Sequence, residues 1–309
     1  MRHINLPKIN KKIIFGAIIL LLAILLFSLF NLTGFLQGSR IDKRDLFSWQ
    51  YNAQDQIEDT EEFAIKGERE TCWILIHSYT ATPLEMKELA RKINFEVNDM
   101  VYVPKLSGHG EVPSHLLDKN ISLWYEEVES RYITFSKLCN KINIVGSSLG
   151  AVIALRLAEE HEVSNLYILN PFQSKPYEPY KLLPFKTRTS LLSSILNYKK
   201  KKELGKINSP EGREAHISYW NMPYLPIKNS LPFIDETISN FNKVTIPTFI
   251  AFSENDEVAG SYSAEKIYSE IGTENKVLLN YPDSNHILLF DYNKDKLLDD
   301  IGSFELRNR

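Results

Sequence analysis

The sequence has few cysteines and no excess of charge of either sign. Only two cysteines occur in 309 residues, and two cysteines far apart in the sequence do not form a cysteine-based metal site. The 36 basic and 39 acidic side chains nearly balance, whereas nucleic-acid-binding chains carry a basic surface. No internal repeat is apparent. We therefore expect neither a metal nor a nucleic acid as a partner of this chain.

The two cysteines, Cys72 and Cys139, allow two interpretations. They act as two small buried apolar side chains, or they pair in a disulfide if the domain lies in an oxidising compartment. Each is placed near the start of a predicted strand, and the two strands can be neighbours. The sequence leaves both interpretations open.

Long apolar runs are also absent, with one exception near the start. Residues 13–30, IIFGAIILLLAILLFSLF, contain no charged side chain. A run of this length is sufficient to cross a bilayer. No small-x-small cleavage site follows it, so an uncleaved anchor is favoured over a signal peptide. No cysteine follows directly either, which argues against a lipoprotein.

The first sixty residues divide into three predicted parts. We expect a basic tail over residues 1–12, a transmembrane anchor over 13–36 and a polar, acidic tether over 37–60. Four basic residues precede the apolar run, and three follow soon after it. This bias predicts a single-pass protein with a cytoplasmic N-terminus and its folded domain outside the cytoplasm.

Residues 61–309 alternate predicted strands with predicted helices. Short apolar runs predict buried strands at 72–77, 100–104, 141–146, 165–170, 246–253 and 276–281. Helical spacing of apolar residues is found at 83–94, 123–138, 149–161 and 261–271, and from residue 293 onward. This alternation predicts an α/β fold with a mainly parallel sheet and helices on both faces. Residues 171–240 are rich in Pro, Tyr and Lys and predict a small cap inserted over the sheet.

The stretch NIVGSSLGAV, residues 143–152, places two serines between two glycines. Gly146, Ser148 and Gly150 form the G-x-S-x-G pattern of a sharp strand-to-helix turn that carries a nucleophile. Both flanking positions must be small because the strand and the helix nearly collide there. Ser148 is therefore the candidate nucleophile, and Ser147 is a small residue whose hydroxyl can satisfy local backbone groups. An ordinary glycine-flanked turn is the alternative.

A nucleophilic serine needs a base and a carboxylate that orients the base. In a parallel sheet such groups follow the carboxyl ends of strands. The segments FSENDEVAG and PDSNHILLFD follow the last two predicted strands and supply Asp256 and His286. Glu254 and Glu257 lie in the same loop as Asp256 and rank below it as alternatives.

Acyl transfer also needs two backbone N–H groups to bind the oxyanion. One is expected from Leu149, directly after the nucleophile, and the other from Tyr79 in the loop HSYTATP. We expect His77 to support that loop structurally and His161 to be solvated. Lys199 to Lys202 predict a solvated charge run, with contact to anionic lipid headgroups as the alternative.

Three segments resemble bacterial carboxylesterases and monoacylglycerol lipases of the α/β-hydrolase superfamily. LIHSYTATPLEM is similar to the His-Gly-Phe-Thr-Gly-x-Pro loop of that group, and PKLSGHG to its Pro-x-Leu-x-Gly-His-Gly segment. SNHILLFDYNKDKLLDDIGSF is similar to its histidine segment and final helix. The resemblance runs from about residue 70 to residue 304 and is thin through the predicted cap.

The resemblance implies an ester hydrolase with no metal or organic cofactor. It implies a catalytic triad of Ser148, Asp256 and His286, with Tyr79 and Leu149 as oxyanion donors. The expected substrate is monoacylglycerol or another lipophilic ester, cleaved through an acyl-enzyme intermediate. Peptidase and thioesterase activities stay open.

One departure from the family pattern concerns Ser78, which stands where the family has glycine. A side chain there is expected to crowd the acyl group or to turn the Tyr79 amide away. The rival hypothesis is therefore an anchored binding or scaffold protein of the same fold that has lost turnover.

Overall fold

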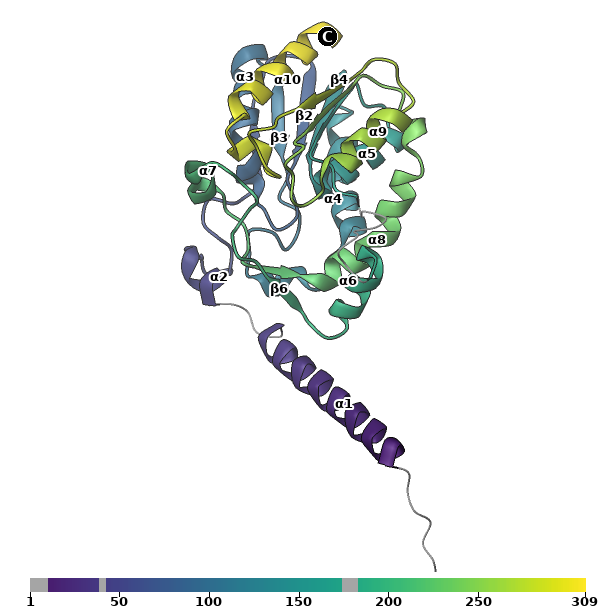
Figure 1. Ribbon diagram of the computed structural model, residues 1–309. Helices are drawn as coiled ribbons and strands as arrows, with labels where there is room; N and C mark the ends of the chain where they lie inside the picture. The colour runs from purple at the N-terminus through teal and green to yellow at the C-terminus, as the bar shows by residue number, and fades with distance from the viewer. Residues whose placement is uncertain (1–10, 39–42, 174–182) are drawn as a thin grey trace, which may run out of the picture.

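The computed structural model of the protein describes residues 11–38, 43–173 and 183–309 (Figure 1). In these ranges seven strands form one sheet in the order β1-β3-β2-β4-β5-β8-β9. β1 is antiparallel to β3, and all other neighbours in the sheet are parallel. The strands are β1 (Phe63–Ile65), β2 (Thr71–Ile76), β3 (Met100–Val103), β4 (Lys141–Ser147), β5 (Asn165–Leu169), β8 (Thr248–Phe252) and β9 (Lys276–Asn280). The predicted α/β fold with a mainly parallel sheet is confirmed.

Helices cover both faces of the sheet (Figure 1). Apolar side chains of α3 and α10 join the core on one face, and those of α4, α5, α8 and α9 join the core on the other. These helices are α3 (Lys87–Val97), α4 (Ile121–Phe135), α5 (Leu149–Glu160), α8 (Tyr224–Ile238), α9 (Ser261–Glu270) and α10 (Lys294–Asn308). α3 begins later than predicted because Pro83–Met86 forms a separate 3-10 turn.

The strand sequences explain why the sheet is buried on both faces. In β2, Cys72, Ile74 and Ile76 point into one core, while Trp73 and Leu75 point into the other. Successive side chains of a strand point to opposite faces, so a continuous apolar run supplies both cores at once.

The region predicted as a cap, residues 171–240, lies between β5 and β8. Its described elements are α6 (Phe185–Ser193), β6 (Tyr198–Lys200), α7 (Pro210–Ala215), β7 (Asn221–Pro223) and α8. β6 and β7 pair antiparallel in a sheet of their own. Part of the predicted cap, residues 174–182, lies outside the described residues.

The N-terminal region begins with α1 (Lys11–Gly38), which lies outside the α/β domain (Figure 1). Among the described residues, no helix satisfies the length and apolarity that a membrane-spanning segment requires. The predicted basic tail, except for its last two residues, falls outside the described part of the chain.

The predicted tether is a packed part of the domain from residue 43 onward. It contains the short helix α2 (Lys43–Ser48), and Asp45 and Ile57 within it are 0% and 2% exposed. The Asp45 carboxylate accepts hydrogen bonds from the backbone N–H groups of Trp220, at 2.6 Å, and Asn221, at 2.9 Å, in the cap. A polar composition predicts an extended linker only when the polar groups face water. Here the Asp45 carboxylate is instead buried and hydrogen-bonded within the domain.

Cys72 and Cys139 form a disulfide, with 5.9 Å between their Cα atoms. The bond connects the start of β2 to the turn that follows α4 and precedes β4. The structure therefore agrees with the interpretation in which the two cysteines pair in a disulfide, and not with the one in which they are two separate buried side chains.

Candidate active site

Ser148 lies at the tight turn between β4 and α5. Its backbone has φ 53° and ψ −112°, a left-handed conformation that costs a non-glycine residue energy and occurs where the fold enforces it. A Cβ on Gly146 would lie 2.3 Å from the carbonyl oxygen of Gly150, and a Cβ on Gly150 would lie 2.4 Å from that of Ile76. Both glycines are therefore needed for the turn, as expected.

The structure brings Ser148, His286 and Asp256 into one hydrogen-bonded chain. The Ser148 hydroxyl lies 2.8 Å from Nε2 of His286, and Nδ1 of His286 lies 2.8 Å from Oδ2 of Asp256. With Nδ1–H donating to the carboxylate, Nε2 is free to accept the hydroxyl proton. The three side chains are almost fully buried.

Asp256 is the carboxylate that contacts His286. The other two acidic residues of its loop do not contact this histidine. The second oxygen of Asp256, Oδ1, accepts the backbone N–H groups of Val258, at 2.7 Å, and Ala259, at 2.9 Å. Burial alone would raise the pKa of Asp256, but His286 and these N–H donors outweigh it and lower that pKa. Glu257 is exposed and pairs with Lys206 at 2.7 Å, and Glu254 is exposed.

The predicted oxyanion donors stand at adjacent strand ends. Leu149 is the first residue of α5, and the Tyr79 loop follows β2, which pairs directly with β4. Among the described residues, neither the Tyr79 N–H nor the Leu149 N–H has a hydrogen-bond acceptor. Unpaired amides at these strand ends are available to stabilise negative charge that develops near Ser148, together with the N-terminal end of α5.

The Ser78 side chain is held by hydrogen bonds to two buried partners. Its hydroxyl lies 2.7 Å from Oε1 of Glu85 and 3.0 Å from the hydroxyl of Ser147, and its N–H donates to Oε2 of Glu85 at 3.1 Å. All three residues are buried. Desolvation raises the pKa of Glu85, and the hydrogen bonds of Ser147 and Ser78 oppose that rise. The Ser147 hydroxyl pairs with side chains rather than with the backbone.

Hydrogen bonds also fix the carbonyl of Ser78, and this sets the direction of the Tyr79 N–H. Leu106 N–H lies 3.3 Å from Nε2 of His77, so Nδ1 of His77 carries the proton and donates to Ser78 O at 2.9 Å. Ala81 N–H donates to the same oxygen at 3.2 Å. In a trans peptide the N–H points opposite to the preceding C=O, so these bonds orient the Tyr79 N–H. His77 supports the loop, as expected, and burial lowers its pKa to about 4.

Asn170 is a site residue that the sequence analysis missed. Its amide donates to the carbonyls of Asn285, at 3.0 Å, and His286, at 2.8 Å, and its Oδ1 accepts from Ser253 N–H at 2.9 Å. It therefore holds together the loops that carry Asp256 and His286. One sequence signal could have identified Asn170. It is a polar residue at the end of a buried apolar strand, and that strand lies next to the strand that leads to the nucleophile.

Lys201 corrects the prediction of a solvated run over Lys199 to Lys202. Its amine donates to Ser218 Oγ at 2.9 Å, to Leu204 O at 2.9 Å and to Thr80 Oγ1 at 3.2 Å. Desolvation, opposed by Asp45, lowers the pKa of Lys201 to about 7. Lys201 thus connects the cap to the loop of Tyr79, while the other three lysines of the run are exposed.

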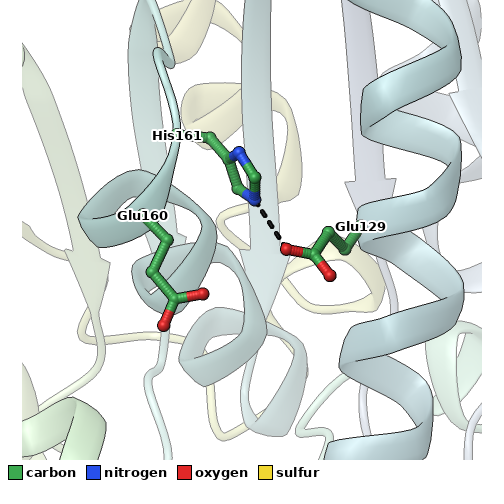
Figure 2. Close-up of side chains that lie close together, drawn as sticks. All are labelled: Glu129, Glu160 and His161. Atoms are coloured by element: carbon green, nitrogen blue, oxygen red, sulfur yellow. Dashed lines mark hydrogen bonds and ion pairs between the residues drawn. The ribbon is translucent and has the colours of Figure 1, made fainter.

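One group of potential metal ligands occurs in the described ranges, formed by Glu129, Glu160 and His161 (Figure 2). Their ligand atoms all lie within 4.8 Å of one another. His161 already pairs with Glu129 at 2.7 Å, and Glu160 accepts from Tyr125 at 2.5 Å. These bonds engage ligand atoms of the group at the far end of α5 from Ser148. They also correct the expectation that His161 is solvated.

The chain is similar to known ester hydrolases. No protein-family model matches the chain. It is 27% identical to a carboxylesterase of Bacillus subtilis (strain 168) over 245 residues, 78% of this chain and 94% of that one. It is 22% identical to a thermostable monoacylglycerol lipase of Bacillus sp. (strain H-257) over 227 residues, 73% of this chain and 86% of that one.

Solved structures show the same fold. A structure reported with the metagenome-derived lipolytic enzymes LipS and LipT has a TM-score of 0.71 at 20% identity, covering 82% of this chain and 98% of its own. The monoacylglycerol lipase of Paleococcus ferrophilus has a TM-score of 0.67 at 12% identity, covering 80% of this chain and 98% of its own. The chain thus has the α/β-hydrolase fold and is similar to bacterial carboxylesterases and monoacylglycerol lipases, which supports its assignment as a carboxylic ester hydrolase.

Proposed function

We propose that the protein is a serine hydrolase that cleaves monoacylglycerols or similar lipophilic esters through an acyl-enzyme intermediate on Ser148. The observation that carries this proposal is the continuous hydrogen-bonded chain from Ser148 through His286 to Asp256. Its carboxylesterase and monoacylglycerol lipase relatives favour an ester over a peptide or thioester substrate.

Acylation begins with attack of Ser148 Oγ on the ester carbonyl carbon. His286 Nε2 takes the hydroxyl proton, and Asp256 stabilises the imidazolium that forms. The carbonyl oxygen becomes an oxyanion and accepts the N–H groups of Tyr79 and Leu149. The intermediate then collapses, the bond to the alcohol oxygen breaks, and His286 gives its proton to the departing alcohol.

Deacylation repeats the same steps with water as the nucleophile. His286 removes a proton from water, the hydroxide attacks the acyl carbon, and the bond to Ser148 Oγ breaks. The proton returns to Ser148, and the carboxylic acid leaves. Each group needed for this cycle belongs to the chain itself.

Features of the N-terminal region support a proposal that the protein acts at a membrane surface. The uncharged run over residues 13–30 has the length of a bilayer span, and apolar side chains of α1 such as Phe15 and Leu26 are exposed. We propose, from this sequence run, that the N-terminal region anchors the protein, with the N-terminus in the cytoplasm and the domain outside. The disulfide between Cys72 and Cys139 supports an oxidising compartment for the domain.

The experiment for the hydrolase proposal is hydrolysis of p-nitrophenyl esters from acetate to palmitate by the full chain in detergent micelles. Ser148→Ala is expected to abolish turnover and covalent labelling by a fluorophosphonate, because only an activated serine reacts. Ser147→Ala is the matched control at the adjacent position and is expected to keep both. Loss of all turnover and labelling in the unmutated protein would instead favour the binding-protein hypothesis.

The proposed topology has a separate test in cells that express the chain. A membrane-impermeant maleimide is expected to label Cys72 and Cys139 in intact cells only after reduction and unfolding of the domain. Labelling that requires permeabilised cells would place the domain in the cytoplasm.

A further inference from the structure

Residues 201–219 of the cap contact both loops that carry the proposed catalytic groups. Lys206 O accepts the N–H of Ile287, the residue after the general base, at 3.2 Å. The His216 ring packs edge-on against Phe290 of the same loop, with 5.2 Å between the ring centroids. The segment also binds the loop that supplies the proposed oxyanion donor, so it joins the two loops.

The loop that supplies this donor contains a strained turn. Ala81 N–H donates to Ser78 O at 3.2 Å and closes a turn of four residues, in which Thr80 is third and has a φ of 65°. Glycine or asparagine usually occupies such a position, because most side chains are strained there. Among the non-glycine residues with a positive φ in the described ranges, Thr80 is the only β-branched one. Contacts around Thr80 must therefore hold the turn in place.

The cap segment supplies these contacts. The Lys201 amine donates to Thr80 Oγ1 at 3.2 Å and to Ser218 Oγ at 2.9 Å, and the two hydroxyl oxygens lie 3.1 Å apart. The amine also donates to Leu204 O at 2.9 Å, so these bonds use all three N–H donors of an ammonium group. Tyr219 N–H donates to Thr80 O at 3.2 Å. Both polar groups of Thr80 that can accept a hydrogen bond are therefore bound by the cap.

The strained turn lies directly against the nucleophile turn. Ser78 Oγ lies 3.0 Å from Ser147 Oγ. Each of these serines immediately precedes a residue of the proposed site, Tyr79 in one case and Ser148 in the other. The Tyr79 N–H therefore belongs to the turn that Thr80 completes, and a change of the Thr80 backbone alters the direction of that N–H relative to Ser148.

We propose that Lys201 is a positioning residue for oxyanion stabilisation, which holds Thr80 in its left-handed conformation and so keeps the Tyr79 N–H directed at the oxyanion. This inference rests on the proposed function and adds a residue of the cap to it. Lys201 itself needs no contact with the substrate. Oxyanion donors stabilise the transition state more than the bound ester, so a misdirected donor lowers kcat and leaves KM nearly unchanged.

The test measures hydrolysis of p-nitrophenyl decanoate by the full chain in detergent micelles, and its inhibition by 1,1,1-trifluorododecan-2-one. Ser148 Oγ adds to the ketone carbon of this inhibitor, His286 takes the hydroxyl proton, and the ketone oxygen becomes an oxyanion. Lys201→Met keeps an unbranched side chain and removes the three donors. We expect kcat to fall about 10-fold, the inhibition constant Ki to rise by about the same factor, and KM to change less than about 3-fold.

Three further variants complete the design. Glycine adopts a positive φ without strain, so Lys201→Met should lower kcat less than about 3-fold when it is introduced into the Thr80→Gly chain. Lys202→Met changes the next lysine, which is exposed, and is expected to leave kcat and Ki unaffected. Ser218→Ala removes the hydroxyl that contacts both Lys201 and Thr80, and it should change kcat and Ki in the same direction as Lys201→Met. It provides the same test if Lys201→Met does not fold.

A merely structural role of Lys201 has a different signature, because unfolded protein lowers the concentration of active sites and leaves Ki unchanged. The inference is overturned if Lys201→Met leaves Ki unchanged, or if it lowers kcat by the same factor in the wild-type and Thr80→Gly chains. A wild-type chain that neither hydrolyses the ester nor binds the ketone overturns the proposed function as well. Hydrolysis of the ester by the wild type separates these two failures.

Discussion

At the scale of single residues, the pair Ser78 and Ser147 explains how this chain accommodates a side chain where the family pattern described above has glycine. The two hydroxyls and the Ser78 N–H gather around the buried carboxyl of Glu85. Glu85 in turn lies on the 3-10 turn before α3 and is buried. This polar cluster therefore holds the loop that carries Tyr79.

This arrangement predicts how substitutions of Glu85 affect stability. Glu85→Ala leaves the Ser78 N–H and two hydroxyls buried without their acceptor, so the free energy of unfolding should fall by about 2–3 kcal/mol. Glu85→Gln keeps an acceptor oxygen and should cost about 1 kcal/mol or less. Urea denaturation of both variants measures the difference. Equal losses in the two variants would show that the hydrogen bonds are not the cause.

At the scale of elements, α2 connects the region after the N-terminal helix to the cap. Asp45 of α2 accepts from Trp220 and Asn221, and Arg44 lies over the Trp220 ring at 4.3 Å. Burial of Asp45 raises its pKa, and the hydrogen bonds from Asn221 and Trp220 oppose the rise. A helix of six residues is not stable alone, so these contacts hold it in place.

Asp45→Ala is therefore expected to loosen the cap. Backbone N–H groups of the cap lose their acceptor, and the free energy of unfolding should fall by about 2–4 kcal/mol. Limited proteolysis should then cut earlier within the cap than in the wild type. Glu58→Ala, an exposed acidic residue in the same region, serves as the control and should change neither measurement.

At the scale of the whole molecule, buried neutral histidines make stability depend on pH. The pKa of His216 is lowered to about 3 and that of His77 to about 4, in both cases mainly by burial. In the unfolded chain a histidine has a pKa of about 6.5. Below about pH 6.5 the unfolded chain therefore binds protons that the folded chain does not, and these two residues lower stability as the pH falls.

His216→Phe isolates one of these contributions. Relative to the wild type, the variant should gain up to about 1.4 kcal/mol of unfolding free energy for each pH unit between about pH 6.5 and pH 4. Other titrating groups are common to both proteins and cancel in the difference. Urea unfolding at several pH values measures it, and a difference that is constant with pH would contradict the burial of a neutral His216.

Much of the fold follows from local patterns. Six apolar runs predicted the strands of the parallel sheet, because a strand buried on both faces must be apolar at every position. The edge strand β1 was missed, since three residues carry too little pattern. In the site, Ser148 was found from a pattern of adjacent residues, and Asp256 and His286 from their places after strands.

The sequence by itself determined the α/β alternation, the nucleophile turn and the order of the candidate catalytic residues, because each depends on residues that are close in the chain. Only the tertiary structure decided the pairing of Cys72 with Cys139, the docking of Asp45 and the cluster around Glu85. It also decided that Lys201 and His216 lie between the catalytic loops. These features join side chains that are distant in sequence, and their energies come from burial and hydrogen bonds that exist only after the chain has folded.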